Sequence, residues 1–158
     1  MLYKQGLYKR LKLDARCEKQ NMNFIEYFEN ILNSQSEDNC KSQREIVVLV
    51  EHGQTVDYIR FEMWRLCQKL KLGSKLDLEY EFDKITKIFT ITKRQDGKIW
   101  TSRVYVRRID KNKLDKLNEL RPDGIVVFGS FSAEQVEVLM KYIQNSNKPG
   151  LEVAFLNR

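Results

Sequence analysis

The sequence predicts a mixed α/β fold in which helices flank a central sheet, with a helical extension at the N-terminus. Three observations predict it. Apolar residues recur at helical spacing in residues 56–70 and 136–143, polar and apolar residues alternate in residues 76–108, and residues 124–128 form a continuous apolar run. From residue 55 onward the expected order of elements is α-β-β-β-α-β-α-β, which is typical of a mixed sheet covered by helices. We expect this domain to span residues 44–158.

Residues 1–43 precede the domain and are expected to hold a basic segment, an amphipathic helix and a polar linker. The helix is expected over residues 22–33, where the apolar residues share one face: Phe24, Ile25, Tyr27, Phe28, Ile31 and Leu32. Such a stripe has two interpretations, since it can pack on the chain's own core or dock on a partner. In the docking interpretation Phe24, Tyr27, Phe28 and Ile31 contact another protein or a second copy of the chain.

A strand and a longer helix open the domain. The apolar, β-branched run from Ile46 to Val50 predicts the strand. The helix is expected between Thr55, a suitable N-cap, and Gly73, a suitable stop. Its core face consists of Val56, Ile59, Met63, Leu66 and Leu70.

Three strands are expected in residues 76–108. Asp96-Gly97 is a type I′ turn signal between the second and the third strand. In the third strand, Lys98 to Arg108, side chains alternate between two faces. This alternation predicts a core face with Trp100, Val104 and Val106 and a basic face with Arg103, Tyr105 and Arg107.

The C-terminal part carries further helix and strand signals. Leucines in residues 114–120 predict a helix that ends before a proline. The apolar run Gly124 to Phe128 predicts a strand buried on both faces. Ser132 and Gln135 match a capping box ahead of the helix over residues 136–143, and a last strand is expected over residues 151–156.

The charge of the chain is positive and unevenly placed. The formal net charge is +6 and the pI is about 9.2. Residues 84–121 contain 12 basic and 4 acidic residues, a net charge of +8, whereas residues 122–158 contain 3 and 4. A local basic excess favours nucleic acid or another acidic surface as the partner. A solvated lysine-rich surface is the alternative interpretation.

Several classes of site are missing from the sequence. It contains no phosphate-binding loop motif, no glycine-rich dinucleotide motif and no zinc-type cluster of Cys and His, so we expect no cofactor and no metal. Cys17, Cys40 and Cys67 lie far apart and are odd in number, which indicates a reducing, intracellular compartment, whether nuclear, cytoplasmic or organellar. No apolar run reaches the roughly 20 residues that cross a bilayer, so we expect no membrane contact.

Two short segments resemble a known family. Phe61-Glu62 and Leu72-Gly73 belong to one predicted helix, and residues 123–132 read Asp-Gly-Ile-Val-Val-Phe-Gly-Ser-Phe-Ser. Over about residues 58–156 the sequence resembles the Mrr-like branch of the restriction-endonuclease-like, or PD-(D/E)XK, superfamily. Members typically open with a helix bearing Phe-Glu and ending near Leu-Gly, and later show a strand, a small-residue turn and Phe-Ser. The resemblance implies a nuclease-like fold.

The resemblance also implies where an active site belongs. The family carries an acid on the second strand and a Gln-type residue two positions before a Lys on the third, which together bind a divalent metal and activate water. Phe89 and Thr90 stand where the acid is expected, and Tyr105-Val106-Arg107 matches the second motif. Arg cannot act as a base and Tyr is a poor metal ligand. The implied site is therefore degenerate, with no catalytic and no metal-binding residue.

Three hypotheses of function follow. The first is a non-catalytic, nuclease-like domain that binds DNA or RNA through its basic hairpin face, a pseudoenzyme. Its expected contacts are Arg103, Tyr105 and Arg107 in the former cleft, surrounded by Lys93, Arg94, Lys98, Arg108 and Lys111. The second is an adaptor subunit of a larger complex that docks through its N-terminal helix. The third is an active metal-dependent nuclease that uses displaced acids such as Asp83 or Glu79.

Overall fold

The computed structural model describes residues 23–34, 42–73, 77–109, 120–146 and 151–156. In chain order its elements are α2 (Phe24–Ser34), β1 (Gln43–Val50), α3 (Gly53–Gly73), β2 (Asp77–Phe82), β3 (Ile88–Gln95), β4 (Lys98–Arg108), β5 (Gly124–Phe128), α4 (Ala133–Asn145) and β6 (Glu152–Leu156). The predicted class, a mixed sheet flanked by helices, is confirmed and is consistent with a nuclease-like fold. The helix expected over residues 114–120 lies outside the described residues.

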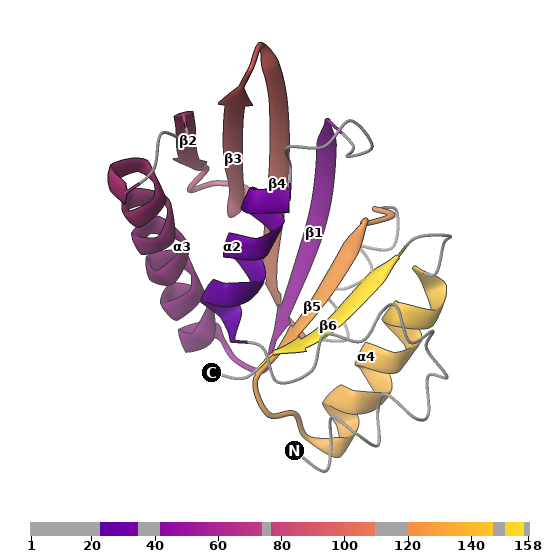
Figure 1. The fold of residues 1–158 in the computed structure, drawn as a ribbon. Helices are drawn as coiled ribbons and strands as arrows, with labels where there is room; N and C mark the ends of the chain where they lie inside the picture. The colour runs from indigo at the N-terminus through magenta and orange to yellow at the C-terminus, as the bar shows by residue number, and fades with distance from the viewer. Residues whose placement is uncertain (1–22, 35–41, 74–76, 110–119, 147–150, 157–158) are drawn as a thin grey trace.

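The sheet has the strand order β2-β3-β4-β1-β5-β6. β2, β3 and β4 pair antiparallel, and β4, β1, β5 and β6 pair parallel. β1 therefore lies in the middle of the sheet, between β4 and β5, as Figure 1 shows. Its residues Ile46 to Val50 are buried because both of its faces are covered.

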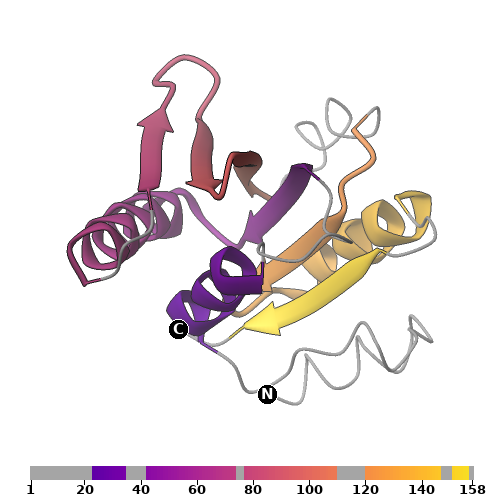
Figure 2. The same cartoon turned by 45° about the horizontal axis from the view of Figure 1, so that its top comes forward.

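The helices cover opposite faces of the sheet. α2 and α3 pack with β-strand residues such as Val48, Val104 and Phe128 in one hydrophobic cluster. α4 packs with Val47, Ile125 and their neighbours in a second cluster on the other face. Figure 2 shows α2 and α3 on one side of the strands and α4 on the other. In the part of the chain that the structure describes, no helix has the length and apolarity that a membrane span requires.

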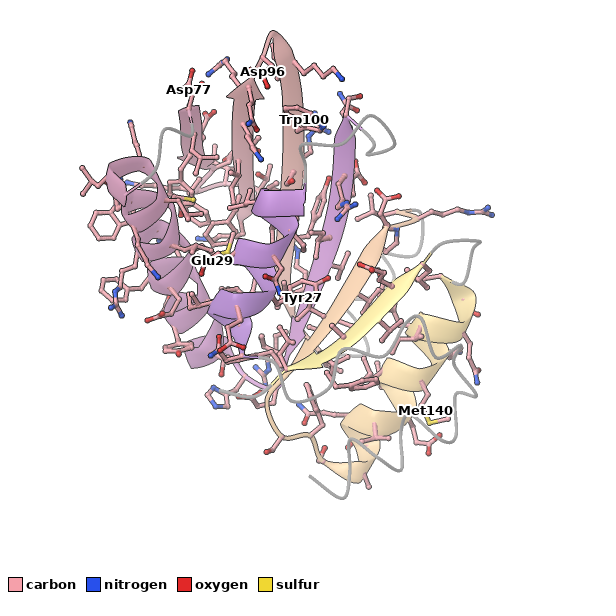
Figure 3. The ribbon with its side chains drawn as sticks, in the orientation of Figure 1. Tyr27, Glu29, Asp77, Asp96, Trp100 and Met140 are labelled. Atoms are coloured by element: carbon pink, nitrogen blue, oxygen red, sulfur yellow. The ribbon has the colours of Figure 1, made fainter. Side chains whose placement is uncertain are left out.

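The position of α2 corrects the docking interpretation. Phe24, Tyr27, Phe28 and Ile31 are all buried against the chain's own sheet and α3. The ring of Phe24 contacts that of Phe128 edge to face, with centroids 5.8 Å apart. Figure 3 shows Tyr27 between α2 and the strands, and burial raises the pKa of its phenol. The apolar stripe of α2 therefore belongs to the core and offers no surface to a partner.

Local signals from the sequence mark most turns and caps correctly. The Asp96-Gly97 turn has φ values of +54° and +79°, as a type I′ turn requires. The capping box of α4 is present in both directions between Ser132 and Gln135. The N-cap predicted for α3 is wrong, because the helix begins at Gly53 and Thr55 lies buried in its first turn.

Candidate nucleic-acid interface

The two faces of β4 differ as the sequence predicts. Val104 and Val106 are buried in the cluster with α2 and α3, and Trp100 is buried on the same face of the strand. Arg103 on the opposite face is exposed, and the alternating Tyr105 and Arg107 are partly buried. Period-two geometry along β4 thus brings two arginines and a tyrosine onto one side of the sheet.

This side of β2, β3 and β4, opposite α2 and α3, is here called the open face. Its charged side chains are Asp77, Glu79, Glu81, Arg94, Arg103 and Arg107, and its uncharged ones include Thr90, Thr92, Thr101 and Tyr105. In one row across the strands, Glu81 pairs with Thr90, Thr90 with Arg103, and Arg103 with Glu45 of β1. The open face therefore carries both signs of charge, because the acids of β2 lie on the same side as the arginines.

Arg107 is committed to the backbone of a neighbouring turn. Its guanidinium donates to the carbonyl oxygens of Thr86 at 2.7 Å, Lys87 at 3.2 Å and Val106 at 2.9 Å. Partial burial lowers the pKa of this guanidinium, which remains charged at neutral pH. Lys87 has a φ of +60°, so the turn that Arg107 holds contains a residue in the left-handed region. Arg107 therefore stabilises the conformation of the β2–β3 turn.

Arg103 keeps its charged end in solvent. About half of its side chain is exposed, at 51%, and its Nη1 lies 3.9 Å from Oε1 of Glu45. Such a long, exposed ion pair stabilises the fold by about 0–1 kcal/mol and is easily exchanged for another anion. Tyr105, two residues further along β4, packs its ring beside the α4 cluster. Of the three predicted cleft residues, Arg103 is the cation most available to a ligand.

The structure corrects the position of Lys93. This residue is 1% exposed and lies on the α2 side of the sheet, not on the open face. Its ammonium donates to the carbonyl oxygen of Leu32 at 2.6 Å and lies 5.7 Å from the ring centre of Trp100. The carbonyl at the end of α2 accepts this bond, so Lys93 fastens the helix to the sheet and cannot reach a nucleic acid.

The other predicted contacts lie around the two ends of β4. Arg94 is exposed and pairs with Glu79 across β2 and β3 at 3.1 Å. Lys98 is exposed next to the Asp96-Gly97 turn, and Arg108 is exposed at the opposite end of the strand. Lys111 lies outside the described residues. Arg94 therefore lies on the open face, whereas Lys98 and Arg108 have the parity of Trp100 and Val106 and belong to the opposite side of β4, at its two ends.

The positions that match the nuclease motif hold structural residues. Phe89 is fully buried and contacts the ring of Phe82, at a centroid distance of 4.7 Å. The carboxylate of Asp83 accepts backbone N–H bonds from Ile85 and Thr86, and these bonds lower its pKa. Within the described ranges, no three His, Cys, Asp or Glu side chains lie close enough to hold a metal ion together.

A second arrangement, of which the sequence shows only the adjacent Glu51 and His52, lies at the carboxyl end of β1. The hydroxyl of Thr55 donates to Oε1 of Glu51 at 2.6 Å, and Nε2 of His52 lies 3.2 Å from the same oxygen. Oε2 of Glu51 is buried with no hydrogen-bond partner among the described residues. A Cβ on Gly129 would lie 1.4 Å from that oxygen, and Nε2 of Gln135 donates to the Glu51 carbonyl at 2.9 Å. Glu51 thus joins β1 to the starts of α3 and α4.

This arrangement lies where open α/β sheets bind ligands. β1 and β5 are parallel neighbours, and the helices that follow them pack on opposite faces of the sheet. Ligands of such sheets bind outside the carboxyl ends of the strands at this kind of switch point. The contacts of Glu51 give it a helix-capping role for α3, because a carboxylate favours the positive end of a helix. The sequence shows Glu51 beside His52, whereas Thr55 and Gly129 join them only through the fold.

Comparisons with known proteins find similar folds among solved structures. No family model and no curated protein matches the chain. The large terminase of a thermophilic bacteriophage has a similar structure, with a TM-score of 0.57 and 12% identity over 89% of this chain and 32% of that one. The Phi-28 gp11 DNA packaging motor has a TM-score of 0.51 and 13% identity over 95% of this chain and 48% of that one. The chain thus spans about a third of the first structure and about half of the second, and at such identities the likeness concerns the fold alone.

Proposed function

We propose that this chain is a non-catalytic domain with a nuclease-like fold that binds nucleic acid across β4 on the open face. Arg103 supplies the central phosphate contact, and Tyr105 beside it supplies an aromatic ring. Arg94 lies on the same face, and Lys98 and Arg108 lie at the two ends of β4. A place in the Mrr-like branch of the nuclease superfamily belongs to the same proposal.

The observation that carries the proposal is the pairing of Arg103 and Tyr105 on one face of β4. A cation that is half exposed stands two residues from an aromatic ring, and single-stranded nucleic acid is held by this combination of charge and stacking. The similar solved structures support the substrate class, since one of them is named as a DNA packaging motor. The acids of β2 restrict the contact to the β4 side of the face, because they repel phosphate.

The test is a salt titration of binding to labelled single-stranded and double-stranded oligonucleotides. Arg103→Ala is expected to weaken binding to both and to reduce the slope of log K against log salt by roughly 0.7–0.9, the contribution of one phosphate contact. Tyr105→Leu keeps an apolar side chain against the α4 cluster and removes the ring. It is expected to weaken single-strand binding by about 1–3 kcal/mol per stacked base and duplex binding much less.

The matched control is Lys141→Ala, which removes one exposed cation from α4. Its salt slope should equal that of the wild type. If Lys141→Ala and Arg103→Ala lose affinity equally, the positive charge acts only through the net charge of the protein and the interface is wrong. Absence of salt-sensitive binding by the wild type at low salt would contradict nucleic-acid binding itself.

The non-catalytic part has its own test. We expect no cleavage of DNA or RNA by the purified protein with magnesium or manganese, since Asp83 serves the β2–β3 turn and Glu79 pairs with Arg94. Metal-dependent cleavage that disappears in Asp83→Ala or Glu79→Ala would show that displaced acids form an active site.

A further inference from the structure

An aromatic groove separates α3 from β2 at the outer edge of the sheet. Its volume is about 410 Å³, and it is lined by Asp57, Arg60, Phe61, Trp64, Tyr80 and Phe82. Phe61 is 55% exposed and Trp64 is 47% exposed, although the core of the molecule buries most other large apolar side chains. Neighbouring exposed aromatic residues of this kind often mark a binding surface.

The walls of the groove are ordered by ring contacts. The rings of Phe61 and Trp64 stack with centroids 6.2 Å apart and 27° between their planes. The guanidinium of Arg60 lies over Phe82, 4.0 Å from the ring centre. One side of the groove therefore consists of stacked aromatic rings of α3. The other side consists of β2 side chains, and Arg60 lies over the ring of Phe82.

β2 is also the edge strand of the sheet. Among the described strands it pairs only with β3, so alternate residues point backbone N–H and C=O groups away from the sheet. Figure 1 shows β2 as the outermost strand on the side of α3. An unpaired edge of this kind is a template for a further strand.

The side chains of β2 set the chemistry of such a strand. Leu78, Tyr80 and Phe82 point to the groove side, and Asp77, Glu79 and Glu81 point to the open face. An added strand would place alternate side chains beside the aromatic residues and the remaining ones beside the three carboxylates. Figure 3 shows Asp77 at the end of β2 that lies near the Asp96 turn.

We propose that β2 and the groove bind an extended segment of a partner protein in which apolar or aromatic residues alternate with Lys or Arg. The segment adds a strand to β2, its apolar side chains enter the groove beside Trp64, and its cations pair with Glu79 and Glu81. Main-chain hydrogen bonds hold the segment, and the two rows of side chains select it. This interaction is separate from nucleic-acid binding on β4.

Charge disfavours the two rival occupants. A second copy of the chain paired β2 to β2 would set the acids of one strand against those of the other, and like charges directly opposite are destabilising. A nucleic acid would bring its phosphates close to the same carboxylates. A basic segment gains from them.

The probe is an acetylated and amidated hexapeptide that alternates lysine with phenylalanine, which matches the six residues of β2. Calorimetry on the full chain should show binding of this peptide. A glutamate–phenylalanine peptide should bind much more weakly, and so should a lysine–phenylalanine peptide with alternate backbone nitrogens methylated. The first comparison tests the charge of the partner and the second tests strand addition.

Two variants locate the site. Trp64→Ala removes the exposed wall of the groove and is expected to weaken the peptide about 30-fold, the effect of losing one interfacial aromatic anchor. Glu79→Gln together with Glu81→Gln should weaken it about fivefold and reduce its salt dependence. Glu134→Gln with Glu137→Gln makes the same charge change on α4 and should leave binding unchanged.

Several results would overturn the proposal. Equal affinity for the acidic or the N-methylated peptide excludes a basic added strand. Unchanged binding in Trp64→Ala places the peptide elsewhere. A single-stranded oligonucleotide whose binding depends on Trp64 would assign the groove to nucleic acid, and a dimer in sedimentation that Trp64→Ala dissociates would assign it to a second copy.

Discussion

The parallel and antiparallel halves of the sheet use their side chains differently. In β5 every residue is buried, as is β1 from Ile46 onward and β6 after its first residue. In β2, β3 and β4 buried residues alternate with exposed or partly buried ones. The parallel half is covered by helices on both faces, whereas the antiparallel half is covered by α2 and α3 on one face.

This difference separates scaffold from surface. Strands that are buried on both faces stabilise the fold through packing, but their side chains are not accessible to a ligand. Strands with one open face carry the residues of both proposed interfaces, Arg103 and Tyr105 on β4 and the acids of β2. Matched pairs of variants can test how far the two halves, and the two faces of the antiparallel half, differ.

The largest effect on stability is expected when one apolar residue from each half of the sheet is replaced by alanine. Phe128→Ala empties a fully buried site in β5 between α2 and α3, and it should lower the free energy of unfolding by about 3–5 kcal/mol. Ile99→Ala truncates an exposed side chain of β4 and should change it by less than about 0.5 kcal/mol. Urea denaturation of both variants measures the contrast. Equal losses would show that the open face of β4 is packed.

The next prediction compares adjacent cations on opposite faces of β3. Lys93→Met keeps the volume of the side chain but leaves the buried carbonyl of Leu32 without this donor, which should cost about 1–3 kcal/mol. Arg94→Met on the open face loses an exposed ion pair and should cost at most about 1 kcal/mol. Oligonucleotide binding by Lys93→Met should equal that of the wild type. If Lys93→Met weakened oligonucleotide binding without lowering the free energy of unfolding, Lys93 would be part of the interface.

Local patterns in the sequence predicted the elements better than their contacts. The bounds of β4 and β5 and the turn between Asp96 and Gly97 agree with the predictions because each depends on neighbouring residues. The place of β1 in the centre of the sheet depends on pairing with β4 and β5, which lie far along the chain. No local pattern specifies such a pairing.

The site residues show the same limit. The alternation of Phe89 and Ile91 already assigns position 93 to the buried face, but the charge of Lys93 favoured the surface interpretation. The sequence favours Arg107 as a ligand contact, because nothing in it shows that the guanidinium binds backbone carbonyls of a distant turn. An apolar stripe such as that of α2 is the same whether it meets its own core or a partner, so only the fold could decide between them.

A smaller effect should separate the two arginines of the open face. Arg107→Met removes the bonds to the Thr86 and Lys87 carbonyls and should cost about 1–2 kcal/mol, since the group is half-buried. Arg103→Met loses only the long contact to Glu45 and should cost less than about 0.5 kcal/mol. Thermal unfolding measures both. If Arg103→Met were the more destabilising variant, Arg103 would be a structural residue and a poor phosphate contact.

The smallest expected effect is a pH dependence of the β2–β3 turn. Backbone N–H bonds from Ile85 and Thr86 lower the pKa of Asp83 in the folded protein. A carboxyl group whose folded pKa is lowered stabilises the fold above its unfolded pKa, and this stabilisation disappears as the pH falls through the lowered value. Below about pH 4 the turn should therefore loosen.

The amide of Lys87, which donates to the carbonyl of Asp83 at 2.8 Å, reports on this loosening through hydrogen exchange. Asp83→Asn retains an oxygen that accepts the same backbone bonds but does not titrate, so its exchange should lack the additional pH step. The buried amides of β5 serve as the internal control, because every residue of that strand is apolar or glycine and none titrates. An identical pH step in Asp83→Asn would trace the loosening to another group, and a step of the same size in β5 would show that acid unfolds both halves of the sheet together.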